Sequence, residues 1–307
     1  MDRSPEIYGF HLKPRLTCNA ETAEWNPLSV DCCLLNHCAA APVRNATATR
    51  LRMMKARLVL TCVLLSAITV HADEITVVTS GAFAPAYREL VPNIERTTHH
   101  KLVTAFGPSM GTAHDAVPQR LARGETIDVV IMAAPALAAL IEQGKVRPGS
   151  LVELAQSAIG MAIKTGAPVP DISTIDALKR TLLAAKSIAC SSSASGVYLS
   201  TELFLKLGIA GQIRTKTQRI ESEPVGEAVA RGDAEIGFQQ MSELLPVKGI
   251  AIVGPLPPGA QRVTVFAAGI PTASKHPEEA RALIEFLASP AAAPAIRKSG
   301  LEPLNSK

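Results

Sequence analysis

Aromatic residues are scarce in this chain, making up 4% of its 307 residues, and its only tryptophan is Trp25. Cysteine is almost absent from residues 73–307, where Cys190 stands alone. Because one cysteine cannot form a disulfide within the chain, we expect Cys190 to be a buried strand residue. An excess of charge is also lacking, since residues 73–307 hold 23 basic and 22 acidic residues. This balance offers no basic surface for a nucleic acid or an anionic membrane.

Long apolar runs are lacking as well. The run LVLTCVLLSAITV has thirteen residues, whereas a transmembrane helix needs about 20. It follows the basic segment Met54–Arg57 and precedes the small-x-Ala cleavage site Val70–Ala72. This order predicts a signal peptide over residues 53–72 and an exported mature protein. Residues 1–52 show no sustained period of 2 or 3.6, and we interpret them as an upstream extension from a misassigned start.

Short β-branched runs alternate with amphipathic segments after residue 72. Strands are predicted over residues 75–79, 102–106 and 128–132, each followed by a helical segment. The alternation predicts an α/β protein with mainly parallel sheets. A stretch rich in proline and glycine, Gly166–Pro170, predicts a crossing into a second lobe, with a hinge between the lobes. The expected boundaries are residues 73–162 with 262–307 for lobe 1, and residues 163–261 for lobe 2.

Three strand-to-helix turns combine hydroxyl groups with glycine: Ser80-Gly81-Ala82, Ser109-Met110-Gly111-Thr112 and Ser191–Gly196. In open α/β sheets, such turns at the carboxyl ends of strands line the ligand crevice. Hydroxyls and free backbone N–H groups at the start of a helix suit a small anion. A serine that only caps its helix is the alternative at each turn. Because the combination recurs three times, we favour anion binding.

Other functional classes have weaker support. The pattern Gly107-x-Ser109-x-Gly111 matches the nucleophile elbow of hydrolases, but no His-Gly-Gly run accompanies it to form an oxyanion hole. We expect no metal site, because His99, His100 and His114 lack metal-ligand spacing. Phosphate-loop and dinucleotide fingerprints are absent, and we expect no cofactor. The predicted export signal argues against the effector domain of a transcription regulator.

Several segments carry a resemblance to a known family: EITVVTSGAFAPAYREL, FGPSM, ETIDVVIMA, ASGVYLSTELFLKLGI, VGEAVARGDAEIGF and ALIEFLASPAAAPAIRKSGLEPL. From Glu74 to about Leu304, the chain resembles periplasmic solute-binding proteins of the molybdate-binding family. The resemblance implies a two-lobed type II periplasmic binding protein that captures an oxyanion for an ABC permease in the inner membrane. It also implies a monomer without enzymatic activity, which closes around its ligand.

The same resemblance implies a set of ligand-binding residues. Ser109 matches a ligand serine, and Ser195 and Val225 match backbone N–H donors. Ala82 replaces a usual ligand serine and Gln240 a usual ligand tyrosine, so a small organic carboxylate is the alternative to a molybdate-like or tungstate-like oxyanion. The complete set of expected contact residues is Ser80, Gly81, Ala82, Ser109, Met110, Ser193, Ser195, Gly196, Val225 and Gln240.

Overall fold

A computed structural model describes residues 73–305, except for residue 222. The expected upstream extension (1–52) and signal peptide (53–72) lie outside the described residues. Within the described part, no helix is both long enough and apolar enough to cross a membrane. The described residues fall within one compact unit, which contains two sheets.

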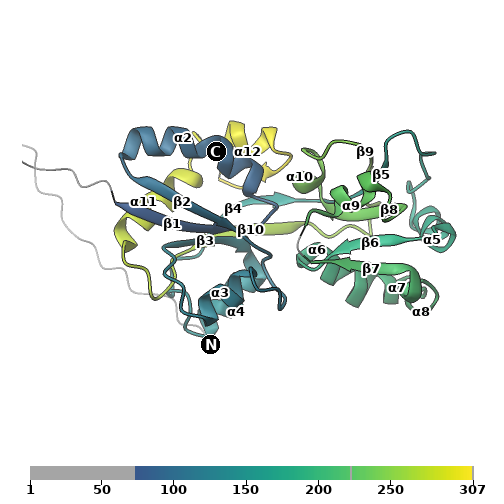
Figure 1. Cartoon of the computed structure of the whole chain (residues 1–307), viewed down its shortest axis with the longest axis horizontal. Coiled ribbons are helices and arrows are strands. Elements are labelled where there is room, and N and C mark those ends of the chain that lie inside the picture. Colours follow the sequence, from purple (N-terminus) through teal and green to yellow (C-terminus); the bar gives the residue numbers. More distant parts are fainter. Residues whose placement is uncertain (1–72, 222, 306–307) are drawn as a thin grey trace, which may run out of the picture. The chain divides into compact units, whose positions relative to one another are not determined.

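A six-stranded sheet forms the centre of lobe 1 (Figure 1). Its strands are, in spatial order, β11 (Glu302–Pro303), β4 (Val152–Ser157), β10 (Thr264–Gly269), β3 (Val129–Ala133), β1 (Glu74–Thr79) and β2 (Lys101–Phe106). Strands β2, β1 and β3 are parallel, whereas β10 runs antiparallel to both β3 and β4. Thr79 of β1 pairs with Phe106 and with Ile131, so the turns that follow β1 and β2 lie at the same edge of the sheet.

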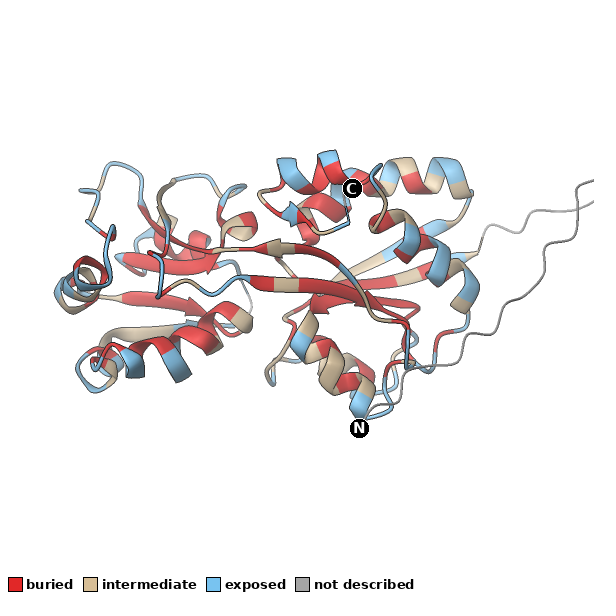
Figure 2. Ribbon diagram, turned by 180° about the vertical axis from the view of Figure 1, so that it is seen from behind, coloured by how far each residue is buried: buried red, intermediate tan, exposed pale blue. Residues whose placement is uncertain are grey.

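Helices cover both faces of this sheet because its strands are apolar on both sides. Val77 and Ile131 belong to one buried cluster, whereas their neighbours Val78 and Val130 belong to another. The first cluster packs beneath α2 (Ala84–Thr98), α11 (Pro277–Leu287) and α12 (Ala293–Lys298). The second packs beneath α3 (Val117–Ala122) and α4 (Ala134–Glu142). Figure 2 shows strands that are buried along most of their length, as the residues of β3 and β10 are.

A five-stranded sheet forms the centre of lobe 2. Its strands are, in spatial order, β7 (Thr217–Ile220), β6 (Ile188–Ser191), β8 (Ile236–Gln240), β5 (Ile159–Lys164) and β9 (Ile250–Pro255). Strand β6 is parallel to β7 and β8, whereas β5 is antiparallel to β8 and β9. The helical segments of this lobe are α5 (Ile175–Ala184), α6 (Ala194–Tyr198), the π-helical η1 (Leu199–Leu203), α7 (Phe204–Lys206), α8 (Ala210–Ile213), the 3₁₀ turn η2 (Arg214–Lys216), α9 (Val225–Arg231) and α10 (Met241–Leu244).

The chain crosses from lobe 1 to lobe 2 at Ala158, between β4 and β5. The sequence-based boundary after residue 162 therefore lies inside β5, which belongs to the sheet of lobe 2. The chain returns between β9 and β10. The two-lobed α/β arrangement agrees with the prediction, but the sheets are mixed rather than mainly parallel. Strands that pass between lobes need no helical crossover, so they can pair antiparallel with their neighbours.

Candidate functional site

A cleft of about 410 Å³ lies between the two lobes. Lobe 1 contributes the turn between β1 and α2, the end of β2, and Phe266 of β10. Lobe 2 contributes the turn between β6 and α6, the start of α9, and the junction between β8 and α10. Turns at the carboxyl ends of β1, β2, β6 and β8 thus meet around one space, as expected for an α/β sheet protein.

Six of the ten residues expected to bind a ligand line the cleft, and four do not. Those in its lining are Ser80, Gly81, Ala82, Ser193, Ser195 and Gln240. Those outside its lining are Ser109, Met110, Gly196 and Val225. Ser80 is only 2% exposed, and its hydroxyl has no hydrogen-bond partner among the described residues, so it is available to a ligand.

Ser109 joins the two lobes. Its hydroxyl accepts a hydrogen bond of 3.0 Å from the backbone N–H of Ala133, at the end of β3. Its own N–H donates to the hydroxyl of Ser193 in lobe 2, at 3.3 Å. Ser109 is fully buried, and the elbow pattern around it gives its hydroxyl a backbone N–H as partner instead of a base. The hydrolase alternative therefore gains no support from this geometry.

The side chain of Gln239 is hydrogen-bonded to the backbone N–H at the start of α9. Its side-chain oxygen accepts a hydrogen bond of 2.8 Å from the N–H of Val225. Its side-chain nitrogen donates to Oε1 of Glu243, at 2.9 Å. The N–H of Val225, which the resemblance assigns to an oxyanion, is thus bonded to a protein group.

Gln240 bonds to the crossing between the lobes. In the amide orientation that satisfies both of its atoms, its oxygen accepts from the hydroxyl of Thr264 at 2.8 Å. Its nitrogen then lies 3.2 Å from the carbonyl oxygen of Ser157 and 3.3 Å from that of Ala158, and donates to them. Gln240 lines the cleft, but its amide bonds β8 to the end of β4 and the start of β10, where the chain passes between the lobes.

Glu243 is a carboxyl group in an otherwise largely neutral part of the cleft. It lies on α10, three residues after the end of β8, and the segment Met241–Leu244 packs against β5 and β8. Removal of the carboxyl from water raises its pKa to about 7, although the hydrogen bond from Gln239 acts in the opposite direction. Gly81 of lobe 1 faces Glu243, and Oε1 occupies the space that a side chain at residue 81 would need.

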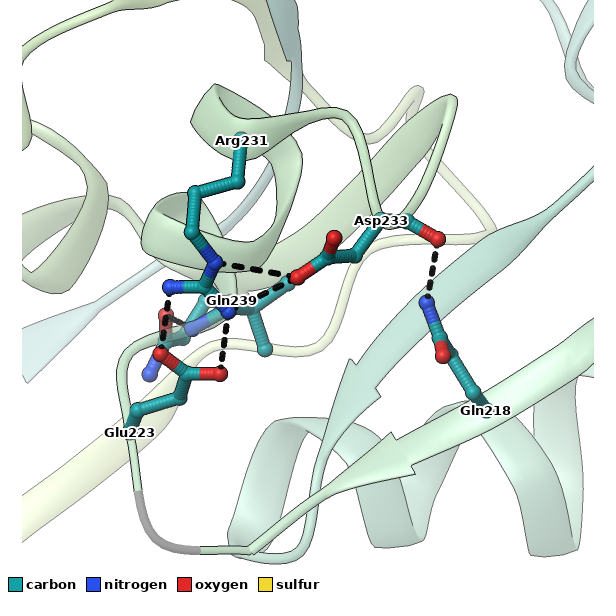
Figure 3. Close-up of polar contacts among 6 residues, drawn as sticks. Gln218, Glu223, Arg231, Asp233 and Gln239 are labelled. Carbon is teal, nitrogen blue, oxygen red and sulfur yellow. Dashed lines mark hydrogen bonds and ion pairs between the residues drawn. The ribbon is translucent and has the colours of Figure 1, made fainter.

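Arg88 brings a positive charge to the cleft. Its guanidinium lies over the ring of Phe106, 4.3 Å from the ring centre, and within the described residues it forms no ion pair. Glu223, an acidic residue of the cleft lining, is bound by Arg231 through two hydrogen bonds of 2.7 and 2.8 Å (Figure 3). These bonds lower the pKa of Glu223, and Arg231 also pairs with Asp233.

Residues 75–302 match the family of bacterial extracellular solute-binding proteins. The chain belongs to this family. It is 49% identical over 230 residues to a Pseudomonas protein named aconitate isomerase, an alignment that covers 75% of this chain and 88% of that protein. It is 25% identical over 247 residues to the molybdate-binding protein ModA of Azotobacter vinelandii, covering 77% and 92%.

Solved structures of two anion-binding proteins share the fold of this chain. The periplasmic molybdate-binding protein of Azotobacter vinelandii superimposes with a TM-score of 0.59 at 20% identity, covering 74% of this chain and 98% of that one. The sulfate-binding protein SubI of Mycobacterium tuberculosis gives a TM-score of 0.61 at 17% identity, covering 76% and 88%. The resemblance to molybdate-type periplasmic binding proteins and the two-lobed type II fold are thus confirmed.

One expectation is wrong. The family resemblance implies a protein without enzymatic activity, and the relative named aconitate isomerase contradicts that prediction.

Arg88, Gln239 and Glu243 are among the cleft residues that the sequence did not single out. They are far apart in the chain, and only the fold brings them to one space. Other candidate chemistry lies elsewhere. Cys190 lines a second cavity of about 370 Å³, and burial raises its pKa to about 12. In the described part of the chain, no cluster of three or more possible metal ligands occurs.

Proposed function

We propose that the protein is an isomerase that binds aconitate, or a closely related tricarboxylate, in the cleft between its lobes. The reaction is supported by the identity of 49% with a relative named aconitate isomerase. The alignment of 230 residues covers 75% of this chain and 88% of that protein, so it is long enough to include both lobes.

The observation that carries the choice of ligand is the loss of two expected oxyanion donors. The hydroxyl of Ser109 lies outside the cleft lining, and the N–H of Val225 is bonded to Gln239. The cleft is lined instead by Arg88, which carries a positive charge. A guanidinium can bind a carboxylate through two parallel hydrogen bonds. This exchange favours a carboxylate over a tetrahedral oxyanion.

The size and the remaining donors of the cleft fit a tricarboxylate. Its volume of about 410 Å³ lies in the range typical of sites for small organic molecules, roughly 300 to 1,000 Å³. The unpaired hydroxyl of Ser80 and the serines of the turn after β6 supply neutral donors for further carboxylate oxygens. Phe106 and Phe266 offer apolar contact to the carbon chain.

Capture of a small anion for an ABC permease is a second candidate, which family membership favours. The ligand would then be a molybdate-like oxyanion or a carboxylate, and closure of the lobes would present it to the permease. For either function we propose a periplasmic location, reached through the signal peptide at 53–72. Fractionation of cells and N-terminal sequencing of the exported protein test this location.

The isomerase proposal is tested by incubating the purified protein with one isomer of aconitate and following the other by proton NMR. We expect catalytic conversion, and thermal unfolding should shift upward with aconitate but not with molybdate, tungstate or sulfate. A ligand at 1,000 times its Kd stabilises a protein by about 4 kcal/mol. Stabilisation by molybdate without any conversion of aconitate would overturn the proposal in favour of anion capture.

A further inference from the structure

The Glu243 carboxyl lies where the two lobes meet at the cleft. The short helix α10 carries it in lobe 2, and Gly81 lies opposite it in lobe 1. Because Gly81 has no side chain, the carboxyl can approach the backbone of the turn after β1. A substrate held by that turn would therefore lie within reach of Glu243.

We propose that Glu243 is the catalytic residue that removes and returns a proton during the isomerisation, with Gln239 as the positioning residue that orients its carboxyl. This inference rests on the proposed function. The hydrogen bond of 2.9 Å from Gln239 fixes Oε1, and the bond from Val225 fixes Gln239 in turn. The carboxyl is thus held by a chain of bonds that begins at the backbone of α9.

The chemistry of aconitate requires one base and no cofactor. Its three carboxylates are attached to a propene chain, in which a CH₂ and a =CH group flank the central carbon. Glu243 takes a proton from the CH₂ carbon, and the electrons of that C–H bond form a new double bond to the central carbon. The electrons of the old double bond take the proton back from Glu243 at the former =CH carbon. The product is an isomer with its double bond on the other side, and no oxidant or reductant is consumed.

Glu243 has few competitors for this role. Among the described residues that line the cleft, none is a histidine, cysteine, lysine or tyrosine. The other carboxyls of the lining belong to Asp115, Glu221, Glu223 and Glu227, of which the three glutamates are exposed. A general base works best with a pKa close to the operating pH.

The pKa of Glu243, raised to about 7 by burial, fits a base that must accept and then release a proton near neutral pH. The groups that face the same cleft are Arg88, Asp115, Glu221, Glu223 and Glu227, and Glu223 is neutralised by Arg231. We therefore expect kcat/KM to rise with pH up to about 7, as Glu243 loses its proton.

The test compares Glu243→Gln with the wild-type protein and with Glu285→Gln, which removes an exposed carboxylate of α11 that does not line the cleft. We expect kcat of Glu243→Gln to fall by about 10²- to 10⁴-fold, with little change in KM, and Glu285→Gln to keep wild-type kcat. For the wild type, deuteration of the substrate CH₂ should slow kcat, because its C–H bond breaks.

The outcomes separate the inference from the proposed function. If the wild type converts aconitate but Glu243→Gln retains its kcat, Glu243 is not the base and the isomerase function stands. If the wild type does not convert aconitate, the proposed function fails, and the inference fails with it. Should Glu243→Gln not fold, Glu243→Asp replaces it. Because the side chain of aspartate is one methylene shorter, its carboxyl lies farther from the substrate and kcat should fall. An unchanged kcat in Glu243→Asp would overturn the inference.

Discussion

Gly81 sets the position of the Glu243 carboxyl because it leaves room for Oε1. We expect Gly81→Ala to displace this flexible side chain without preventing folding, and to lower kcat by about 10²-fold, since small misplacements of catalytic groups are costly. Gly211→Ala is the matched control, because a methyl group at residue 211 meets nothing within 4 Å. Equal steady-state rates for the two variants would show that the approach of Glu243 to Gly81 has no catalytic role.

Gln239 tunes the proton affinity of Glu243. Its hydrogen bond favours the charged carboxylate and therefore lowers the pKa from the higher value that burial alone would give. In Gln239→Met we expect the pKa of Glu243 to rise above about 7, so the acid limb of kcat/KM should move to higher pH. A pH–rate profile measures this shift, and an acid limb that stays in place or moves to lower pH would contradict it.

At the scale of elements, the junction between β8 and α10 organises the cleft. Successive side chains of a strand point to opposite sides. Gln239 accordingly reaches the start of α9, while Gln240 reaches Ser157 and Thr264 at the crossing between the lobes. Four residues after Gln239, Glu243 returns to the same side and receives its hydrogen bond. One junction thus supplies the proposed base, its positioning residue and an anchor for the crossing strands.

The anchor makes a prediction for stability. Gln240→Ala removes a buried amide and leaves the hydroxyl of Thr264 and the carbonyls of Ser157 and Ala158 without this partner. We expect a loss of about 1 to 3 kcal/mol in the free energy of unfolding. Chemical denaturation measures the loss, with Gln212→Ala, an exposed glutamine on α8, as the control. A loss no larger than that of the control would show that the amide is not a structural anchor.

Several elements could be predicted from sequence and others could not. Strands β1, β2 and β3 are apolar runs bounded by turns, and their periodicity is sufficient to predict them. Strand β8 ends in two glutamines, a residue type that does not mark a strand in a sequence. Helix α10 has four residues, which are too few for a periodic pattern. Glu243 lies in that helix, which explains why the sequence did not reveal it.

At the scale of the whole described molecule, two contacts bring the lobes together at the cleft. One is the approach of Glu243 to Gly81, and the other is the hydrogen bond from Ser109 to Ser193. Both join a turn of lobe 1 to a residue of lobe 2. Sequence similarity predicts the two lobes, but it does not predict which donors the protein itself occupies, since that depends on side-chain contacts between distant segments.

The measurement that tests the account most directly is a pair of progress curves for the purified protein, one started from cis-aconitate and one from trans-aconitate. A catalyst must bring both mixtures to the same final ratio, at a rate proportional to protein concentration. We predict this convergence for the wild type and its near absence for Glu243→Gln. Curves that stay at their starting isomer in the presence of wild-type protein would contradict the account.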